Sequence, residues 1–61
     1  MSYLHHQALY ELMRQGLHFY VDRAEACWER GLRFELNPSI RVPGSLRALL
    51  RQCNRLLEAQ E

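Results

Sequence analysis

Apolar residues recur at alternating intervals of three and four along the first half of the chain. The seam consists of Tyr10, Met13, Leu17, Tyr20, Ala24 and Cys27, and it is widened into a stripe by Leu9, Gly16, Val21 and Trp28. This spacing is typical of an amphipathic helix that buries one face, and it predicts a helix over residues 3–31. Ser2 can cap the start of this helix with its hydroxyl. Arg30 followed by Gly31 is a typical helix end.

Gly16 interrupts this predicted helix. A glycine inside a helix costs about 1 kcal/mol relative to alanine. However, the seam continues through Gly16 in register, and neither Pro nor Asn supports a turn there. We therefore expect one long helix of about 42 Å, bent at Gly16. The alternative is a break at Gln15 and a second helix starting near Leu17, which would allow a three-helix monomer.

Residues 32–44 connect this helix to the next one. Apolar and charged side chains alternate over residues 32–36, as they do in a strand, and the Asn-Pro-Ser sequence at 37–39 is a turn signal. The segment is therefore either a small hairpin or an irregular loop. We favour the loop, because two isolated strands are marginally stable in water. The apolar side chains that would plug the end of the helical core are Phe34, Leu36, Ile40 and Val42.

The clearest helical pattern covers residues 45–59. Its apolar positions follow the i, i+3, i+4, i+7 spacing of a helix face, and they are Leu46, Leu49, Leu50, Cys53, Leu56 and Leu57. Ser45 follows a Pro-Gly pair and is expected to be the N-cap. The pattern predicts a second amphipathic helix.

These elements predict an all-α fold in a single small domain, residues 1–61. The long helix and the C-terminal helix each carry an apolar stripe broader than a two-helix hairpin can cover. Two hairpins would close a four-helix bundle, and a two-fold dimer is the commonest closed assembly. A chain of 61 residues needs such help to fold. We therefore expect a homodimer, with its core or dimer interface formed by Tyr10, Met13, Leu17, Phe19, Tyr20, Trp28, Leu46, Leu49, Leu50, Cys53, Leu56 and Leu57.

The composition argues against several classes of function. No apolar stretch approaches the ~18 residues of a membrane span, and the N-terminus lacks the pattern of a secretory signal. We therefore expect a cytoplasmic protein without membrane contact. Cys27 and Cys53 fall on apolar helix faces, which favours reduced core thiols. The three histidines and two cysteines show no metal-ligand spacing. The chain is also too small to shape a usual ligand pocket. We expect no metal, no cofactor, no small-molecule substrate and no enzymatic activity.

Positive charge gathers in the second half of the chain. All eight basic residues are Arg, and no acidic residue lies between Glu35 and Glu58. That stretch contains Arg41, Arg47, Arg51 and Arg55, and the last three are spaced by four, on one side of the predicted helix. Arg can bind a carboxylate or phosphate with two donors at once. The four arginines are candidates for binding a protein partner or nucleic acid; otherwise they form an ordinary solvated face.

These features predict a small non-enzymatic protein that binds another host or cellular protein and regulates or inhibits it. Such a protein is compatible with an accessory role in a phage or mobile element. The alternative is a small nucleic-acid-binding transcriptional regulator that uses the arginine face. A third possibility is a purely structural assembly subunit. The aromatic residues would serve as interface anchors in the first case, although Tyr10, Tyr20 and Trp28 are equally explained as core residues; they are Tyr3, Tyr10, Phe19, Tyr20, Trp28 and Phe34.

Overall fold

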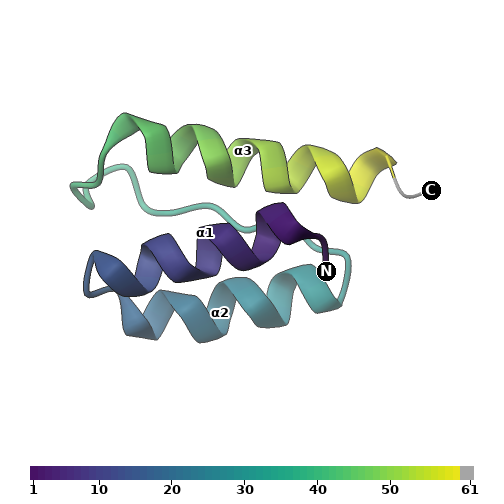
Figure 1. Cartoon of the computed structure of the whole chain (residues 1–61), viewed down its shortest axis with the longest axis horizontal. Helices are drawn as coiled ribbons and strands as arrows, with labels where there is room; N and C mark the ends of the chain where they lie inside the picture. The colour runs from purple at the N-terminus through teal and green to yellow at the C-terminus, as the bar shows by residue number, and fades with distance from the viewer. Residues whose placement is uncertain (60–61) are drawn as a thin grey trace.

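The computed structural model describes residues 1–59 and contains three helices (Figure 1). They are α1 (Tyr3–Arg14), α2 (His18–Glu29) and α3 (Gly44–Ala59). No strand occurs within residues 1–59. The expected all-α class is therefore confirmed, and the segment from residue 32 to residue 43 is a loop without a hairpin.

The three helices and this connector lie side by side, with α1 between α2 and α3 (Figure 1). The helix α1 packs against both of the others and runs antiparallel to each of them. The connector returns along the length of the molecule, from the end of α2 to the start of α3. It therefore acts as a fourth packed element.

The expectation of one long N-terminal helix is wrong, because the chain reverses at Gly16. Gly16 has a φ of +78°, which is readily accessible only to glycine. Its N–H donates to the Met13 carbonyl and the N–H of Leu17 donates to the Leu12 carbonyl, at 2.9 and 3.0 Å. These two bonds are the Schellman motif, which satisfies the last carbonyls of a helix. The break at Gln15 was the alternative that the pattern left open.

The end of α2 has the same motif, as its sequence predicted. Gly31 has a φ of +74° and donates to the Trp28 carbonyl, and Leu32 donates to the Cys27 carbonyl. At the start of α1, the Ser2 cap is also confirmed, since the Ser2 hydroxyl accepts from the His5 N–H. The expected cap at Ser45 is wrong.

The helix α3 begins one residue before Ser45, at Gly44. The carbonyl of Pro43 accepts from the N–H groups of Leu46 and Arg47. Pro43 is therefore the residue at which the helical hydrogen bonding starts, and Ser45 lies inside the first turn. The Pro-Gly pair takes part in the helix start instead of preceding it.

The core closes within one chain. Its buried apolar residues come from all three helices and the connector, and they are Ala8, Leu9, Leu12, Ala24, Trp28, Phe34, Leu36, Leu46, Leu50 and Cys53. The connector contributes to this core as expected, with Phe34 and Leu36 buried and with Ile40 and Val42 packed against them. It lies along the core rather than at its end (Figure 1).

The core face of α1 differs from the seam that defined the predicted helix. It consists of His5, Ala8, Leu9 and Leu12, whereas Tyr10 and Met13 are exposed. Of the other candidate core or interface residues, Trp28, Leu46, Leu50 and Cys53 are buried, Leu17, Tyr20, Leu49, Leu56 and Leu57 are partly buried, and Phe19 is exposed. A dimer would cover the apolar stripes of a two-helix hairpin, but this chain forms three helices. The homodimer stays a prediction.

Candidate binding surface on α3 and the connector

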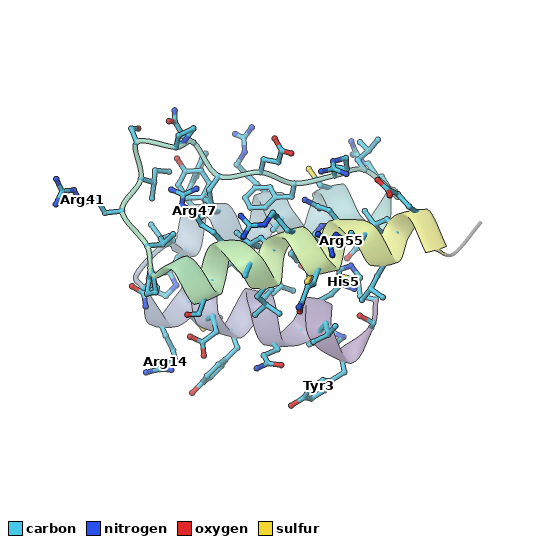
Figure 2. All side chains as sticks on the ribbon, turned by 90° about the horizontal axis from the view of Figure 1, so that it is seen from above. Tyr3, His5, Arg14, Arg41, Arg47 and Arg55 are labelled. Atoms are coloured by element: carbon cyan, nitrogen blue, oxygen red, sulfur yellow. The ribbon has the colours of Figure 1, made fainter. Side chains whose placement is uncertain are left out.

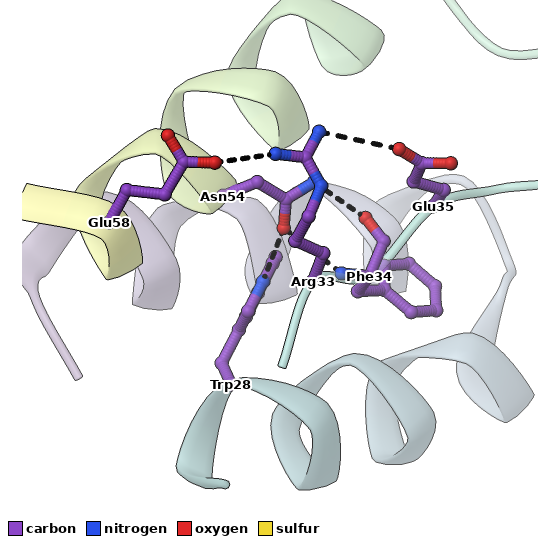
Figure 3. Close-up of polar contacts among 6 residues, drawn as sticks. All are labelled: Trp28, Arg33, Phe34, Glu35, Asn54 and Glu58. Atoms are coloured by element: carbon purple, nitrogen blue, oxygen red, sulfur yellow. Dashed lines mark hydrogen bonds and ion pairs between the residues drawn. The ribbon is translucent and has the colours of Figure 1, made fainter. Parts of the chain in front are cut away.

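A buried asparagine joins α3 to both the connector and α2. The Asn54 Oδ1 accepts from Trp28 Nε1 and from the Phe34 N–H, each at 3.0 Å. The Asn54 Nδ2 donates to the Phe34 carbonyl at 2.9 Å. Figure 3 shows this set of bonds. Because Asn54 is 2% exposed, its amide replaces the water that these groups would otherwise bind.

Directly outside this network, Arg33 links the connector to the last turn of α3. Its guanidinium contacts Glu58 Oε1 at 2.9 Å and Glu35 Oε1 at 3.4 Å (Figure 3). All three side chains are more than half exposed, so these ion pairs add little to stability. They do balance the charge of Arg33 against two carboxylates.

Arg47 is occupied within the protein. Its Nη2 donates to the carbonyls of Asn37 and Pro38, at 3.3 and 3.4 Å, and also to the carbonyl of Ile40. The turn that it holds is also closed by Asn37, whose Oδ1 accepts from the N–H and the hydroxyl of Ser39. Arg47 therefore fixes the end of the connector against α3. Its hydrogen-bonding capacity is partly used before any partner binds.

The other three candidate arginines are exposed and make no ion pair or side-chain hydrogen bond with residues 1–59. Arg51 and Arg55 follow Arg47 along α3, and each step of four residues rotates the position by about 40° around the helix axis. Arg41 projects from the connector beyond the start of α3 (Figure 2). The structure thus divides the predicted set into one structural arginine and three that pair with no carboxylate of residues 1–59.

A shallow hollow of about 200 Å³ lies between α3 and the connector, next to these arginines. Its walls include Arg47 and Arg51 from α3, and Glu35 and Leu36 from the connector. Asn54 and Phe34 are also at its edge. The hollow is smaller than a usual ligand pocket, but its lining combines two arginines with the apolar residues Phe34, Leu36 and Leu50. Such a surface can hold a carboxylate-bearing side chain of a partner.

The remaining polar groups of the core have structural partners. His5 is 1% exposed, and its Nε2 lies 3.0 Å from the Cys53 carbonyl. Its Nδ1 accepts from the Ser2 N–H at 3.1 Å, which places the ring proton on Nε2. Burial lowers the pKa of His5 below its ordinary value of 6.5. The ring also packs edge-on against Trp28.

Both cysteines are free thiols, Cys53 buried and Cys27 half-buried. Burial raises the pKa of Cys53 to about 11, so its thiolate is scarce at neutral pH. Within residues 1–59, no group of three or more His, Cys, Asp or Glu side chains converges as a metal site would require. No helix in this part of the chain is long and apolar enough to cross a membrane.

The sequence reasoning missed Asn54, His5 and Arg33. Asn54 carried a signal that was not used, because it sits beside Cys53 on the apolar face of α3, where a polar side chain needs a buried partner. His5 and Arg33 gave no such signal, since their partners are distant in sequence. Comparisons with known proteins found no matching family, no similar curated protein and no similar solved structure. Any functional conclusion therefore rests on the site itself.

Proposed function

We propose that this chain is a non-enzymatic binding protein that regulates or inhibits another protein by covering an acidic part of its surface. The binding groups are Arg51 and Arg55 of α3, together with Arg41 of the connector. The observation that carries the proposal is that the four candidate arginines differ in their contacts within the protein. Arg47 stabilises the connector, which leaves the other three guanidinium groups exposed and without carboxylate partners among residues 1–59.

A protein partner is favoured over nucleic acid because acidic side chains lie on the same surface. Glu35 and Glu58 flank Arg33 and would repel a phosphate backbone that follows α3. Nucleic-acid affinity also depends on the number of phosphates that are neutralised. Three free arginines are few for that purpose, whereas a protein surface can offer both acids for the arginines and bases for the two glutamates.

Capture of the partner from the source cells tests this proposal when it is done with matched charge variants. The pair Arg51→Glu and Arg55→Glu reverses the proposed contacts without touching Arg47. Arg14→Glu is the control, because Arg14 is exposed on α1, away from the labelled arginines of α3 and the connector (Figure 2). We expect the wild type and the control to retain a specific acidic protein that the double variant loses.

The same experiment separates the two classes of partner. Nuclease treatment of the lysate should leave the captured protein in place. Loss of all captured material after nuclease treatment would favour the nucleic-acid regulator instead. Equal capture by all three forms of the protein would contradict a role for the arginine face.

A further inference from the structure

We propose that the groove between α2 and the connector binds an extended acidic segment of a partner protein, which pairs as a β-strand with the backbone of Arg33 and Glu35. This groove lies on the α2 side of the connector, whereas the arginine face lies on the α3 side, and only connector residues line both. The inference does not depend on the function proposed for the arginine face. Three features of the described residues support it: an unpaired backbone edge, a groove of suitable size and an unpaired cation.

The backbone edge follows from the bonds of Asn54. In an extended chain, the N–H and C=O groups of one residue point to the same side, and those of its neighbours point to the opposite side. Both backbone groups of Phe34 bond to the Asn54 amide on α3. The connector is extended at this point, since Phe34 and Leu36 are buried while Arg33 and Glu35 are exposed. The backbone groups of Arg33 and Glu35 therefore point away from α3, towards α2.

These groups have no partner among residues 1–59. The backbone N–H and C=O groups of Arg33 and Glu35 are in none of the hydrogen bonds that hold the connector, which involve Leu32, Phe34 and residues 37–40. An exposed extended segment of this kind is a template for an additional strand. A strand placed there would exchange up to four hydrogen bonds with Arg33 and Glu35.

The groove beside this edge has a volume of about 640 Å³. One wall is the connector from Arg33 to Pro38, and the other is α2, with Phe19, Tyr20, Arg23 and Cys27. Phe19 is 66% exposed, whereas Tyr20 and Cys27 are half-buried. A groove between an extended segment and a helix suits a peptide strand, whose alternate side chains point down to the groove and up to solvent.

The charge of the residues that line the groove determines which peptide sequence it should bind most tightly. The guanidinium carbon of Arg23 lies 5.3 Å from the centre of the Phe19 ring, and no carboxylate of residues 1–59 forms an ion pair with it. Of the charged residues that line the groove, Arg33 and Glu35 form an ion pair with each other, so the charge of Arg23 leaves the lining net positive. A strand with alternating apolar and acidic residues would place apolar side chains on Tyr20 and Cys27. Its acidic side chains would then lie at the rim, within reach of Arg23.

A second copy of this chain fits the groove less well than a peptide strand does. Its own connector presents the same edge, but only from inside a groove whose far wall is α2. Pairing of two connectors would bring the two α2 walls against each other. The expected occupant is therefore a free strand, and self-association at this edge is an outcome that the experiment must detect.

The probe is an acetylated and amidated heptapeptide of alternating valine and glutamate, added to the full chain labelled with ¹⁵N. We expect the amides of Arg33 and Glu35 to shift and to exchange with solvent more slowly as the peptide is added. The Phe34 amide should be protected both without and with the peptide, because it is already bonded to Asn54. Methylation of alternate amides removes the peptide N–H groups that would donate to the connector. The methylated peptide should bind at least about tenfold more weakly than the unmethylated one.

Three further arms complete the test. The corresponding valine–lysine peptide should bind more weakly than the glutamate peptide, and Arg23→Glu should reverse this preference. Arg51→Gln with Arg55→Gln should leave the protection of the Arg33 and Glu35 amides by the peptide in place, so failure here is distinguishable from failure of the arginine-face proposal. Phe19→Ala, at an exposed position, should weaken binding without loss of helix content.

The proposal would be overturned by any of several results. One is the absence of protection at Arg33 and Glu35 at millimolar peptide. Another is equal binding of the methylated peptide or of the lysine peptide. A third is protection of these two amides in the free protein together with a dimer in sedimentation, which would show that a second copy covers the edge.

Discussion

Replacing Asn54 by alanine should remove the strongest polar link between the connector and the helices. The substitution leaves three buried or nearly buried groups without a partner: Trp28 Nε1–H and the N–H and C=O of Phe34. Each such group costs about 1–3 kcal/mol when it stays unsatisfied. Removal of the Asn54 amide would open the adjoining hollow, so that water could replace part of its bonds to Phe34. We therefore expect the low end of the range, a loss of about 3 kcal/mol in the free energy of unfolding.

That loss is large for a protein of this size. A domain of 61 residues is expected to have a free energy of unfolding of about 3–9 kcal/mol. Urea denaturation followed by helix content and by the fluorescence of Trp28, the only tryptophan, measures the loss. Gln52→Ala is the matched control, because Gln52 is exposed on the same helix and should change stability by less than about 0.5 kcal/mol. A loss below about 1 kcal/mol for Asn54→Ala would show that these three groups do not depend on the Asn54 amide.

The other predictions concern the turn, the arginines, the buried histidine and the thiols. Gly16→Ala should cost about 1–2 kcal/mol in thermal or urea unfolding because of the positive φ, whereas Gly44→Ala, in open helical space, should be neutral or stabilising. Arg47→Ala should lower the free energy of unfolding by about 1–2 kcal/mol through loss of its carbonyl contacts. Arg51→Ala should change it by less than about 0.5 kcal/mol. Equal effects would contradict the structural role assigned to Arg47 alone. Because the pKa of His5 is lowered in the folded state, the unfolded chain binds the extra proton first, so stability should be full above pH 6.5 and fall as the pH drops below it. This dependence should persist in His6→Ala and disappear in His5→Gln. Cys53, with its pKa raised to about 11, should stay unmodified by a thiol reagent at pH 8 in the folded protein, and half-buried Cys27 should react first.

The helical pattern predicted the class of fold but misplaced the first turn. The seam through Tyr10, Met13 and Leu17 keeps its spacing across Gly16, so the pattern indicates continuity where the chain reverses. The core face of α1 includes His5 and Ala8, which contribute little to an apolar pattern. Tyr10 and Met13 contribute more to the pattern, although they are exposed. Helix propensity alone assigns an interior glycine a cost of about 1 kcal/mol, which does not predict a helix end. The turn is determined by the Schellman hydrogen bonds at Gly16.

The candidate site was predicted only in outline. The spacing of Arg47, Arg51 and Arg55 correctly placed them along one side of a helix, but it could not distinguish the arginine that holds the connector from those that are free. That distinction depends on the carbonyls of residues 37–40, which become neighbours of Arg47 only in the folded chain. The same holds for Asn54 and Phe34, which are 20 residues apart, and for His5 and Cys53, which are 48 apart. These contacts contribute to stability because they are buried. They could not be predicted from the sequence because the partners are far apart along the chain.

Photo-crosslinking in the source cells shows whether a protein partner contacts the exposed arginine face. A benzophenone amino acid at position 48 lies at the margin of that face, since position 48 is half-buried beside α1 and its neighbour Arg51 is three residues further along α3. The same group at position 10 on α1, where Tyr10 is 60% exposed, serves as the control. We predict a nuclease-resistant adduct with one acidic protein from position 48, weakened by Arg51→Glu with Arg55→Glu. Adducts only from position 10, or only with nucleic acid, would contradict the account.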